Sequence, residues 1–219
     1  MKMAILGGSF NPIHIGHLAL ADDVCVTLGY DKILFVPTAT PPHKAMREVV
    51  PAQDRLGMVK AACSEDERFI AEGCEIERGG VSYTCDTIRI LEEKYKDTLE
   101  GKLGLIMGED LLPDFHLWNR AEEIAQRCTL IVARRPYKQE SALFANKNVG
   151  DYGKTCQLDF DITKEPLFNN CVAIENPLLT ISSTDIRERI SCGKSFEYLV
   201  PRPVFSYIIN GKLYGYKQQ

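Results

Sequence analysis

The chain has 219 residues, 45% of them hydrophobic, with a formal net charge of −4 and a pI of about 5.7. This length and apolar content allow a sizeable core, and the mild acidity disfavours a broad basic surface for long nucleic acid. The start of the chain lacks a secretory signal pattern, and no apolar run approaches the ~20 residues of a membrane span. We therefore expect a soluble, cytoplasmic protein without a nucleic-acid or membrane partner.

Eight cysteines are scattered along the chain, at positions 25, 63, 74, 85, 128, 156, 171 and 192. No two have the C-x-x-C spacing of a metal clip, and they do not cluster with histidine. Cys25, Cys128 and Cys171 stand inside apolar patterns, where a thiol behaves as a small hydrophobic group. The spacing predicts reduced cysteines and argues against a zinc site or a disulfide framework.

The first half of the chain alternates compact apolar runs with segments of helical period. Leu18, Ala21 and Cys25 illustrate that period, because they recur on one stripe of a helix. In chain order we predict a strand at 3–6, a helix at 17–28, a strand at 32–37, a helix at 52–64, a short strand at 74–78 and a helix at 84–95.

The second half continues the alternation. Its runs LGLIM and TLIVA are nearly continuous in apolar residues, as expected for strands buried on both faces. Residues 137–170 have no clear period and predict an irregular surface excursion. The other elements predicted are strands at 103–107, 129–133 and 172–175, and helices at 120–126, 183–191 and 203–210.

Strands separated by helices imply right-handed crossovers and a parallel sheet. The predicted fold is α/β: one domain over residues 1–219 with a doubly wound, mostly parallel sheet and helices on both faces. In such folds the ligand crevice lies at the carboxyl ends of the strands. The polar stretches of this chain fall just after predicted strands, so they are the candidates for function.

The stretch GGSFNPIHIGH, residues 7–17, leaves the first strand and enters the first helix. Glycines at such a turn favour phosphate binding, because a helix start offers unpaired N–H groups and a positive dipole end. Two common phosphate fingerprints are absent, however. G-x-G-x-x-G does not occur, and the GKS at 193–195 has Glu188 where G-x-x-x-x-G-K-[ST] needs its first glycine.

Two histidines, His14 and His17, bracket the start of that helix. Both imidazoles could therefore face an anion held by the amides of residues 7–10. The alternative is one buried histidine and one capping histidine, with no ligand. The full H-x-G-H pattern after a glycine turn favours the anion site.

The stretch SFNPIHIGH resembles the (S/T)-x-x-x-x-H-x-G-H signature of the nucleotidyltransferase α/β phosphodiesterase superfamily, which has a Rossmann-like nucleotidyltransferase fold. The literal H-I-G-H is also the signature of class I aminoacyl-tRNA synthetases. Both groups bind ATP there and act at its α-phosphate. A synthetase core is disfavoured, because no tRNA-binding region or basic surface follows.

Near the other end of the chain, ISSTDIR at 181–187 resembles a motif of the adenylyltransferase branch of that superfamily. Ser182 or Ser183 suits an N-cap, and a capped helix start is a second anion site. Arg187 lies one turn after Thr184, so both side chains can reach one anion. An ordinary cap with a solvated arginine is the alternative; the pairing with H-x-G-H favours a two-sided triphosphate clamp.

Four further stretches are similar to the bacterial nicotinate mononucleotide adenylyltransferases: PPHK at 41–44, SYTCDT at 82–87, MGEDL at 107–111 with Trp118 following, and ARRP at 133–136. The resemblance runs from Met3 to about Tyr214. It implies transfer of the AMP moiety of ATP to nicotinate mononucleotide, with nicotinate adenine dinucleotide and pyrophosphate as products.

The resemblance also implies roles for single residues, each with a plain structural alternative. Lys44 would meet the acceptor's phosphate, Thr84 the ring carboxylate, and Trp118 would stack on the pyridine ring. The alternatives are a solvated lysine, a helix cap and a packing tryptophan. Gly108 and Asp110 would line the ribose, with a cap as the alternative for Asp110, and Arg134 would face nucleotide or solvent.

On the ATP side, the residues expected to act in catalysis are His14, His17 and Arg187. Those expected to bind ATP are Gly7, Gly8, Ser9, Phe10, His17, Ile181, Ser183, Thr184 and Arg187. Mg²⁺ is expected to arrive on the ATP through phosphate oxygens and water, without a protein cage.

Two other functions stay open at this point: another adenylyl- or cytidylyltransferase of the superfamily, such as the phosphopantetheine enzyme, and a non-catalytic nucleotide sensor. The SYTCDT stretch and Trp118 disfavour the first, and the intact histidines disfavour the second. The choice between nicotinate and nicotinamide mononucleotide, the adenine contacts and the oligomeric state also stay open.

Overall fold

The computed structural model describes residues 1–40, 50–134 and 165–217. Lys44 and Cys156 lie outside these ranges, as does most of the surface excursion predicted over 137–170. No helix in the described ranges is long and apolar enough to cross a membrane.

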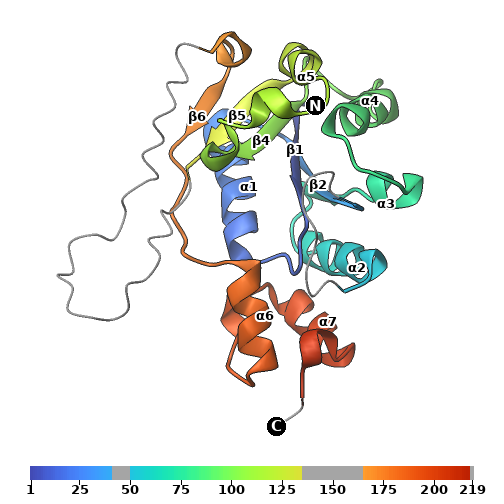
Figure 1. The fold of residues 1–219 in the computed structure, drawn as a ribbon, viewed down its shortest axis with the longest axis vertical. Coiled ribbons are helices and arrows are strands. Elements are labelled where there is room, and N and C mark those ends of the chain that lie inside the picture. The colour runs from blue at the N-terminus through green and yellow to red at the C-terminus, as the bar shows by residue number, and fades with distance from the viewer. Residues whose placement is uncertain (41–49, 135–164, 218–219) are drawn as a thin grey trace, which may run out of the picture.

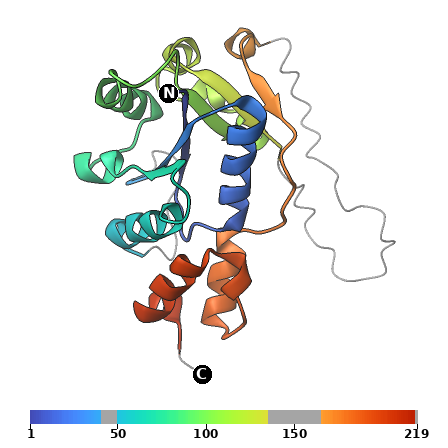
Figure 2. The same ribbon diagram turned by 180° about the vertical axis from the view of Figure 1, so that it is seen from behind.

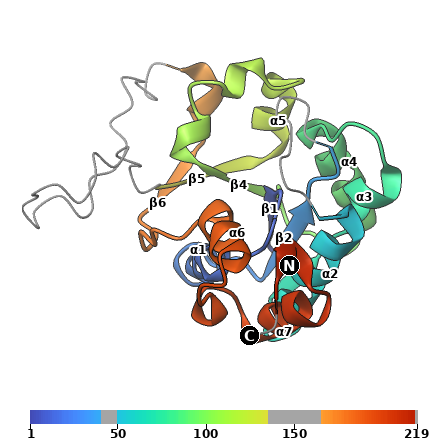
Figure 3. The ribbon, with the colours of Figure 1, turned by 60° about the horizontal axis from the view of Figure 1, so that its bottom comes forward.

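The described residues form one six-stranded parallel sheet with the order β3-β2-β1-β4-β5-β6. The chain starts at β1, builds outwards to β3, then returns to β4 on the other side of β1, so the order reverses between β1 and β4 (Figure 3). The predicted doubly wound α/β class is confirmed. The strands are β1 Met3–Gly8, β2 Lys32–Pro37, β3 Phe69–Ala71, β4 Gly104–Gly108, β5 Thr129–Ala133 and β6 Val172–Ile174.

Helices connect the strands from β1 to β5, and two more α-helices follow β6 (Figure 1). The α-helices are α1 Ile15–Leu28, α2 Ala52–Cys63, α3 Cys74–Arg78, α4 Thr84–Lys94, α5 Ala121–Arg127, α6 Ser183–Ser191 and α7 Arg202–Asn210. Short 3₁₀ turns are η1 Glu109–Leu111, η2 Phe115–Leu117, η4 Pro166–Phe168, η5 Glu197–Leu199 and η6 Leu213–Gly215.

The sheet is buried on both faces because successive side chains of a strand point to opposite sides. In β1, Ala4 and Leu6 join the apolar cluster under α1, α2, α6 and α7. Met3 and Ile5 join the cluster under α3, α4 and α5. Figure 2 shows α1 lying along the first of these faces. In Figure 1, β1 runs from the amino terminus to an end just above α6, so this carboxyl edge of the sheet faces α6 and α7.

Three sequence predictions need correction. The predicted strand at 74–78 is wrong: these residues form α3, and the strand here is β3, Phe69–Ala71. Helix α1 begins at Ile15 and not at residue 17, because His14 is its N-cap. The last residues of the predicted surface excursion include η4, whose Phe168 is buried and packs against Phe115 with ring centroids 5.3 Å apart.

The cysteines of the described ranges all carry free thiols. Those of the core include Cys25, Cys63 and Cys128, which lie among apolar side chains. Burial disfavours the thiolate, so it raises the pKa of Cys63 to about 12. These thiols are packing groups that stay protonated at neutral pH.

Candidate active site

The end of β1 and the turn after it are partly exposed to solvent. Gly7 and Ser9 are exposed and Gly8 is half-buried, whereas Phe10 as a whole is only 1% exposed. Phe10 has a φ of 43°, a left-handed conformation that is uncommon for a residue with a side chain. The chain therefore turns inward at Phe10, and the exposed residues Gly7 and Ser9 are the ones most accessible to a ligand.

The two histidines stack at the start of α1. Their ring centroids lie 3.7 Å apart with 28° between the ring planes, and Phe10 meets His17 edge-on at 5.0 Å. The backbone N–H of His14 donates to Nδ1 of His17 at 3.2 Å. A neutral His17 ring that accepts at Nδ1 carries its proton on Nε2. The backbone thus presets Nε2–H as the donor that His17 can offer to a phosphate oxygen.

Gly16 explains the glycine of the H-x-G-H pattern. A Cβ on Gly16 would lie 3.1 Å from Nδ1 of His14, closer than such contacts normally are. Glycine therefore leaves room for the His14 ring beside the first turn of α1, and a larger residue would require that ring to shift. The order of the four residues fixes where both imidazoles lie.

Helix α6 begins beside the β1–α1 turn and contacts its residues Asn11 and Pro12. Ser182 is its N-cap, with Oγ accepting from the N–H of Asp185 at 3.1 Å. Ser183 Oγ donates instead to the carbonyl of Pro12 at 2.8 Å, and Arg187 Nη1 donates to the carbonyl of Asn11 at 2.9 Å. The two distant motifs therefore lie in contact; their use as a triphosphate clamp stays a prediction. Thr184 is exposed on the same first turn, 3.4 Å from Arg187 Nη2.

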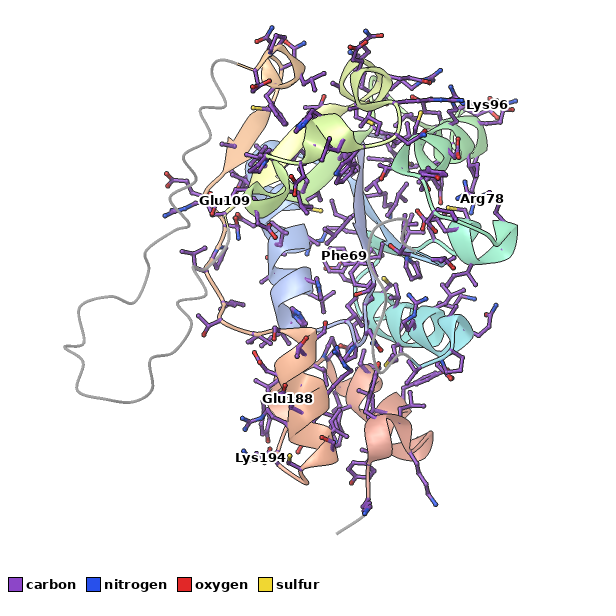
Figure 4. The ribbon with its side chains drawn as sticks, viewed as in Figure 1. Phe69, Arg78, Lys96, Glu109, Glu188 and Lys194 are labelled. Carbon is purple, nitrogen blue, oxygen red and sulfur yellow. The ribbon has the colours of Figure 1, made fainter. Side chains whose placement is uncertain are left out.

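The carboxyl ends of the strands bring part of the predicted acceptor side to the same edge. Gly108 ends β4 in register with Ala133 of β5, so Asp110 and Arg134 both follow at this edge. Asp110 is exposed within η1, whose N-cap is Gly108, so the interpretation of Asp110 as the cap is wrong. In Figure 4, Glu109 of η1 lies above α6, which carries Glu188.

Thr84 is the first residue of α4 and is half-buried. The N-cap is Tyr83, so the interpretation of Thr84 as an ordinary cap is wrong. Nearby, Ser82 Oγ accepts from the N–H groups of Ala39 and Thr40 at 3.1 and 3.4 Å. The start of α4 therefore lies against the segment that leaves β2 and leads to residue 44.

Trp118 lies in a different setting. It ends η2, is half-buried, and packs at 5.3 Å against Phe115 in the cluster of the second sheet face. A shallow hollow beside it is lined by His116, Arg120, Pro166 and neighbouring residues. In the described part of the chain, no ring contact or side-chain hydrogen bond joins Trp118 to the β1–α1 turn.

A scan of known families identifies residues 5–189 as cytidylyltransferase-like. A protein of Treponema pallidum, named as a probable nicotinate-nucleotide adenylyltransferase, is 40% identical over 214 residues, covering 98% of this chain and 99% of its own. A protein of Salinibacter ruber with the same name is 37% identical, covering 98% of each chain. The chain belongs to the nicotinate-nucleotide adenylyltransferase family.

Solved structures agree with this adenylyltransferase fold. The nicotinic acid mononucleotide adenylyltransferase of Plasmodium falciparum, complexed with APC, superposes with a TM-score of 0.70 at 17% identity, covering 100% of this chain and 99% of that one. Its complex with NaAD gives a TM-score of 0.69. At this identity the likeness concerns the fold.

Three residues that form hydrogen bonds at the carboxyl edge of the sheet belong to no sequence motif. Tyr214 donates its hydroxyl to Oδ1 of Asn11 at 2.9 Å, and Asn176 Oδ1 accepts from the N–H of Arg134 at 2.8 Å. Arg55 is 1% exposed and donates to the carbonyl of Ser9 at 2.8 Å. Arg55 did leave a signal, because it shares a helical stripe with the apolar Val59 and Ala62.

Proposed function

We propose that this chain transfers the AMP moiety of ATP to nicotinate mononucleotide, releasing pyrophosphate and forming nicotinate adenine dinucleotide. The observation that carries the proposal is the contact of α6 with the β1–α1 turn, through Ser183 and Arg187, in a chain that matches this family along its length. Two helix starts with their N–H groups at one place favour a polyphosphate.

The chemistry needs positioning more than proton transfer. A phosphate oxygen of the mononucleotide attacks the α-phosphorus of ATP, and the bond from that phosphorus to the bridging oxygen of the β-phosphate breaks. The electron pair leaves with pyrophosphate. The attacking phosphate is already an anion at neutral pH, so no general base is required. Alignment and neutralisation of charge supply the rate enhancement.

On the ATP side, we assign the amides of Gly8 to Phe10 to the triphosphate. His17 Nε2–H donates to an oxygen between the α- and β-phosphates, where negative charge grows as the bond breaks. His14 stacks on His17 and holds that ring in place. The outer end of the triphosphate meets Thr184 and Arg187. Gly7 and Ile181 complete the nucleotide contacts in this proposal.

On the acceptor side, we assign Lys44 to the mononucleotide phosphate, Thr84 to the ring carboxylate and Trp118 to stacking on the pyridine. Gly108 and Asp110 line the ribose, and Arg134 faces the nucleotide. Because the present setting of Trp118 is apart from the β1–α1 turn, its role requires that the mononucleotide extend to η2, or that η2 move on binding.

Magnesium enters this proposal as part of the substrate MgATP. Within residues 1–40, 50–134 and 165–217, no three side chains of His, Cys, Asp or Glu gather as a metal site. Phosphate oxygens and water are the ligands that Mg²⁺ prefers, and they come with the nucleotide. The proposal places the reaction in the cytoplasm with small-molecule partners alone.

A substrate panel tests the function. Purified protein is assayed for pyrophosphate release with MgATP and, separately, nicotinate mononucleotide, nicotinamide mononucleotide and phosphopantetheine. We expect the highest kcat/KM with nicotinate mononucleotide. A preference for phosphopantetheine would assign the other branch of the superfamily, and no pyrophosphate with any acceptor would indicate a nucleotide sensor.

A further inference from the structure

Arg55 is a charged side chain buried inside the molecule. It stands on α2, is 1% exposed, and is among the largest fully buried side chains. Burying a guanidinium is costly unless it is paired or hydrogen-bonded. Within the described residues no carboxylate forms an ion pair with Arg55, and its Nε has no hydrogen-bond partner. An apolar side chain would fill this space at a lower free-energy cost, which indicates that Arg55 has a role beyond packing.

The hydrogen bonds of Arg55 go to two loops at the carboxyl edge. Nη1 donates to the carbonyl of Ser9 at 2.8 Å, and Nη2 lies 3.4 Å from the carbonyl of Ala39. Ser9 follows β1, and Ala39 follows β2 on the way to residue 44. One rigid, planar group therefore bridges the segments that leave two neighbouring strands.

The bond to Ser9 also orients the next N–H. In a trans peptide the carbonyl and the following N–H point in opposite directions. With the Ser9 carbonyl turned inward to Arg55, the N–H of Phe10 points away from the buried guanidinium. Phe10 has its φ at 43°, and such a conformation persists only where neighbouring groups enforce it. Arg55 is one such group.

Arg55 keeps its positive charge although it is buried. Burial disfavours its cationic form and lowers its pKa, whereas Tyr214 and Glu75 act in the opposite direction. The usual pKa of arginine is so high that the side chain stays charged at neutral pH. A fixed positive charge thus lies behind the turn whose outer side exposes Gly7 and Ser9.

We propose that Arg55 is a positioning residue for the phosphate-binding turn. It holds the Ser9–Phe10 peptide, and with it the exposed Gly7–Ser9 backbone that would meet the triphosphate. It also ties this turn to Ala39, in the segment after β2 that leads to Lys44. This inference rests on the proposed function. It links the two substrate sides through one side chain that touches neither substrate.

The test compares Arg55→Lys and Arg55→Met with the wild type. Lysine keeps the charge but lacks the fork that reaches two carbonyls; methionine keeps much of the volume without charge or donors. Arg68→Met is the matched control, because Arg68 forms surface ion pairs with Asp66 and Asp22. Measured quantities are kcat and KM for each substrate, Tm, MgATP affinity by calorimetry, and amide hydrogen exchange over residues 8–14.

We expect Arg55→Lys to fold, to lose about 10-fold or more in kcat/KM for MgATP, and to exchange the amides of the turn faster. If Arg55→Met folds, its kcat/KM for MgATP should fall by about 100-fold. The control should keep wild-type kcat/KM and exchange in the turn. Wild-type kinetics and exchange in Arg55→Lys, or a fall in Tm alone, would overturn the proposal. If the wild type itself makes no pyrophosphate, the proposed function fails, while ATP affinity and exchange still decide the role of Arg55.

Discussion

On the β1 side of the carboxyl edge, side chains from α2, α6 and η6 hold the turn through its own backbone and Asn11. On the β4 side, two of the proposed acceptor contacts belong to 3₁₀ turns: Asp110 is exposed in η1, and Trp118, at the end of η2, is half-buried and packs on the Phe115 ring. Polar bonds to carbonyls define one geometry, whereas ring packing tolerates several. The ATP side is thus preorganised, and the acceptor side is where specificity can change without disturbing the chemistry.

His17→Ala is the strongest test of this contrast. It removes the preset Nε2–H donor while leaving the amides that bind ATP, so we expect kcat to fall by about 10²–10³-fold. The KM for MgATP should change only a few-fold. His17→Gln is the control, because its amide can still donate and should recover part of kcat. A near-normal kcat in His17→Ala would show that the ATP side is not preorganised around this donor.

Trp118→Ala tests the other side. If the indole stacks on the pyridine ring, truncation should raise the mononucleotide KM by about 10-fold or more, since stacking on an aromatic side chain contributes ~1–3 kcal/mol. Trp118→Phe should retain most of the affinity, and the KM for MgATP should stay the same in both variants. An unchanged mononucleotide KM would assign Trp118 to packing against Phe115 alone.

Two glycine substitutions separate folding from ligand contact on the ATP side. A Cβ on Gly7 meets nothing within 4 Å, so Gly7→Ala should keep the wild-type Tm and lose only ATP affinity, with KM up by about 10-fold. A Cβ on Gly16 strikes the His14 ring, so Gly16→Ala should lower kcat by about 10-fold as the ring shifts. Equal losses of Tm in both would contradict this division.

The serines at the start of α6 give the smallest expected effects. Ser183→Ala loses the bond to the Pro12 carbonyl and should raise the KM for MgATP by about five-fold. Ser182→Ala loses the N-cap and should chiefly lower stability, by ~1 kcal/mol, in a urea titration. A larger KM effect from Ser182→Ala would mean that the helix start, and not its tie to the turn, matters for ATP.

Much of this fold follows from the sequence. The runs at 32–37 and 129–133 are strands with the predicted bounds, because long apolar runs between helical stripes have one good interpretation. The strand predicted at 74–78 was wrong because five residues are too few to distinguish a period of two from one of 3.6. The strand found here, β3, has only three residues and so leaves little pattern. Burial of Phe168 was hidden in a segment without a period.

Part of the candidate site could also be predicted from the sequence, and part could not. The pairing of H-x-G-H with ISSTDIR was predictable, since each motif carries its own chemistry and helix starts gather at one edge of a parallel sheet. Arg55, Tyr214 and Asn176 were not, because each acts by hydrogen-bonding a backbone carbonyl, a backbone N–H or an amide side chain far away in sequence. Such partners depend on the finished fold; the apolar helical stripe of Arg55 predicts its burial but not its partners.

The contacts that complete the phosphate turn span nearly the whole chain. The carbonyl of Pro12 accepts from Ser183, 171 residues later, and Oδ1 of Asn11 accepts from Tyr214, 203 residues later. A nascent chain therefore has H-x-G-H long before it has a finished nucleotide site, since distant contacts close last. We expect a chain truncated after residue 212 to fold its sheet yet bind MgATP more weakly than the intact chain; equal affinity would refute this. ATP affinity would then depend on a residue, Tyr214, that is synthesised about 200 residues after the turn that it holds.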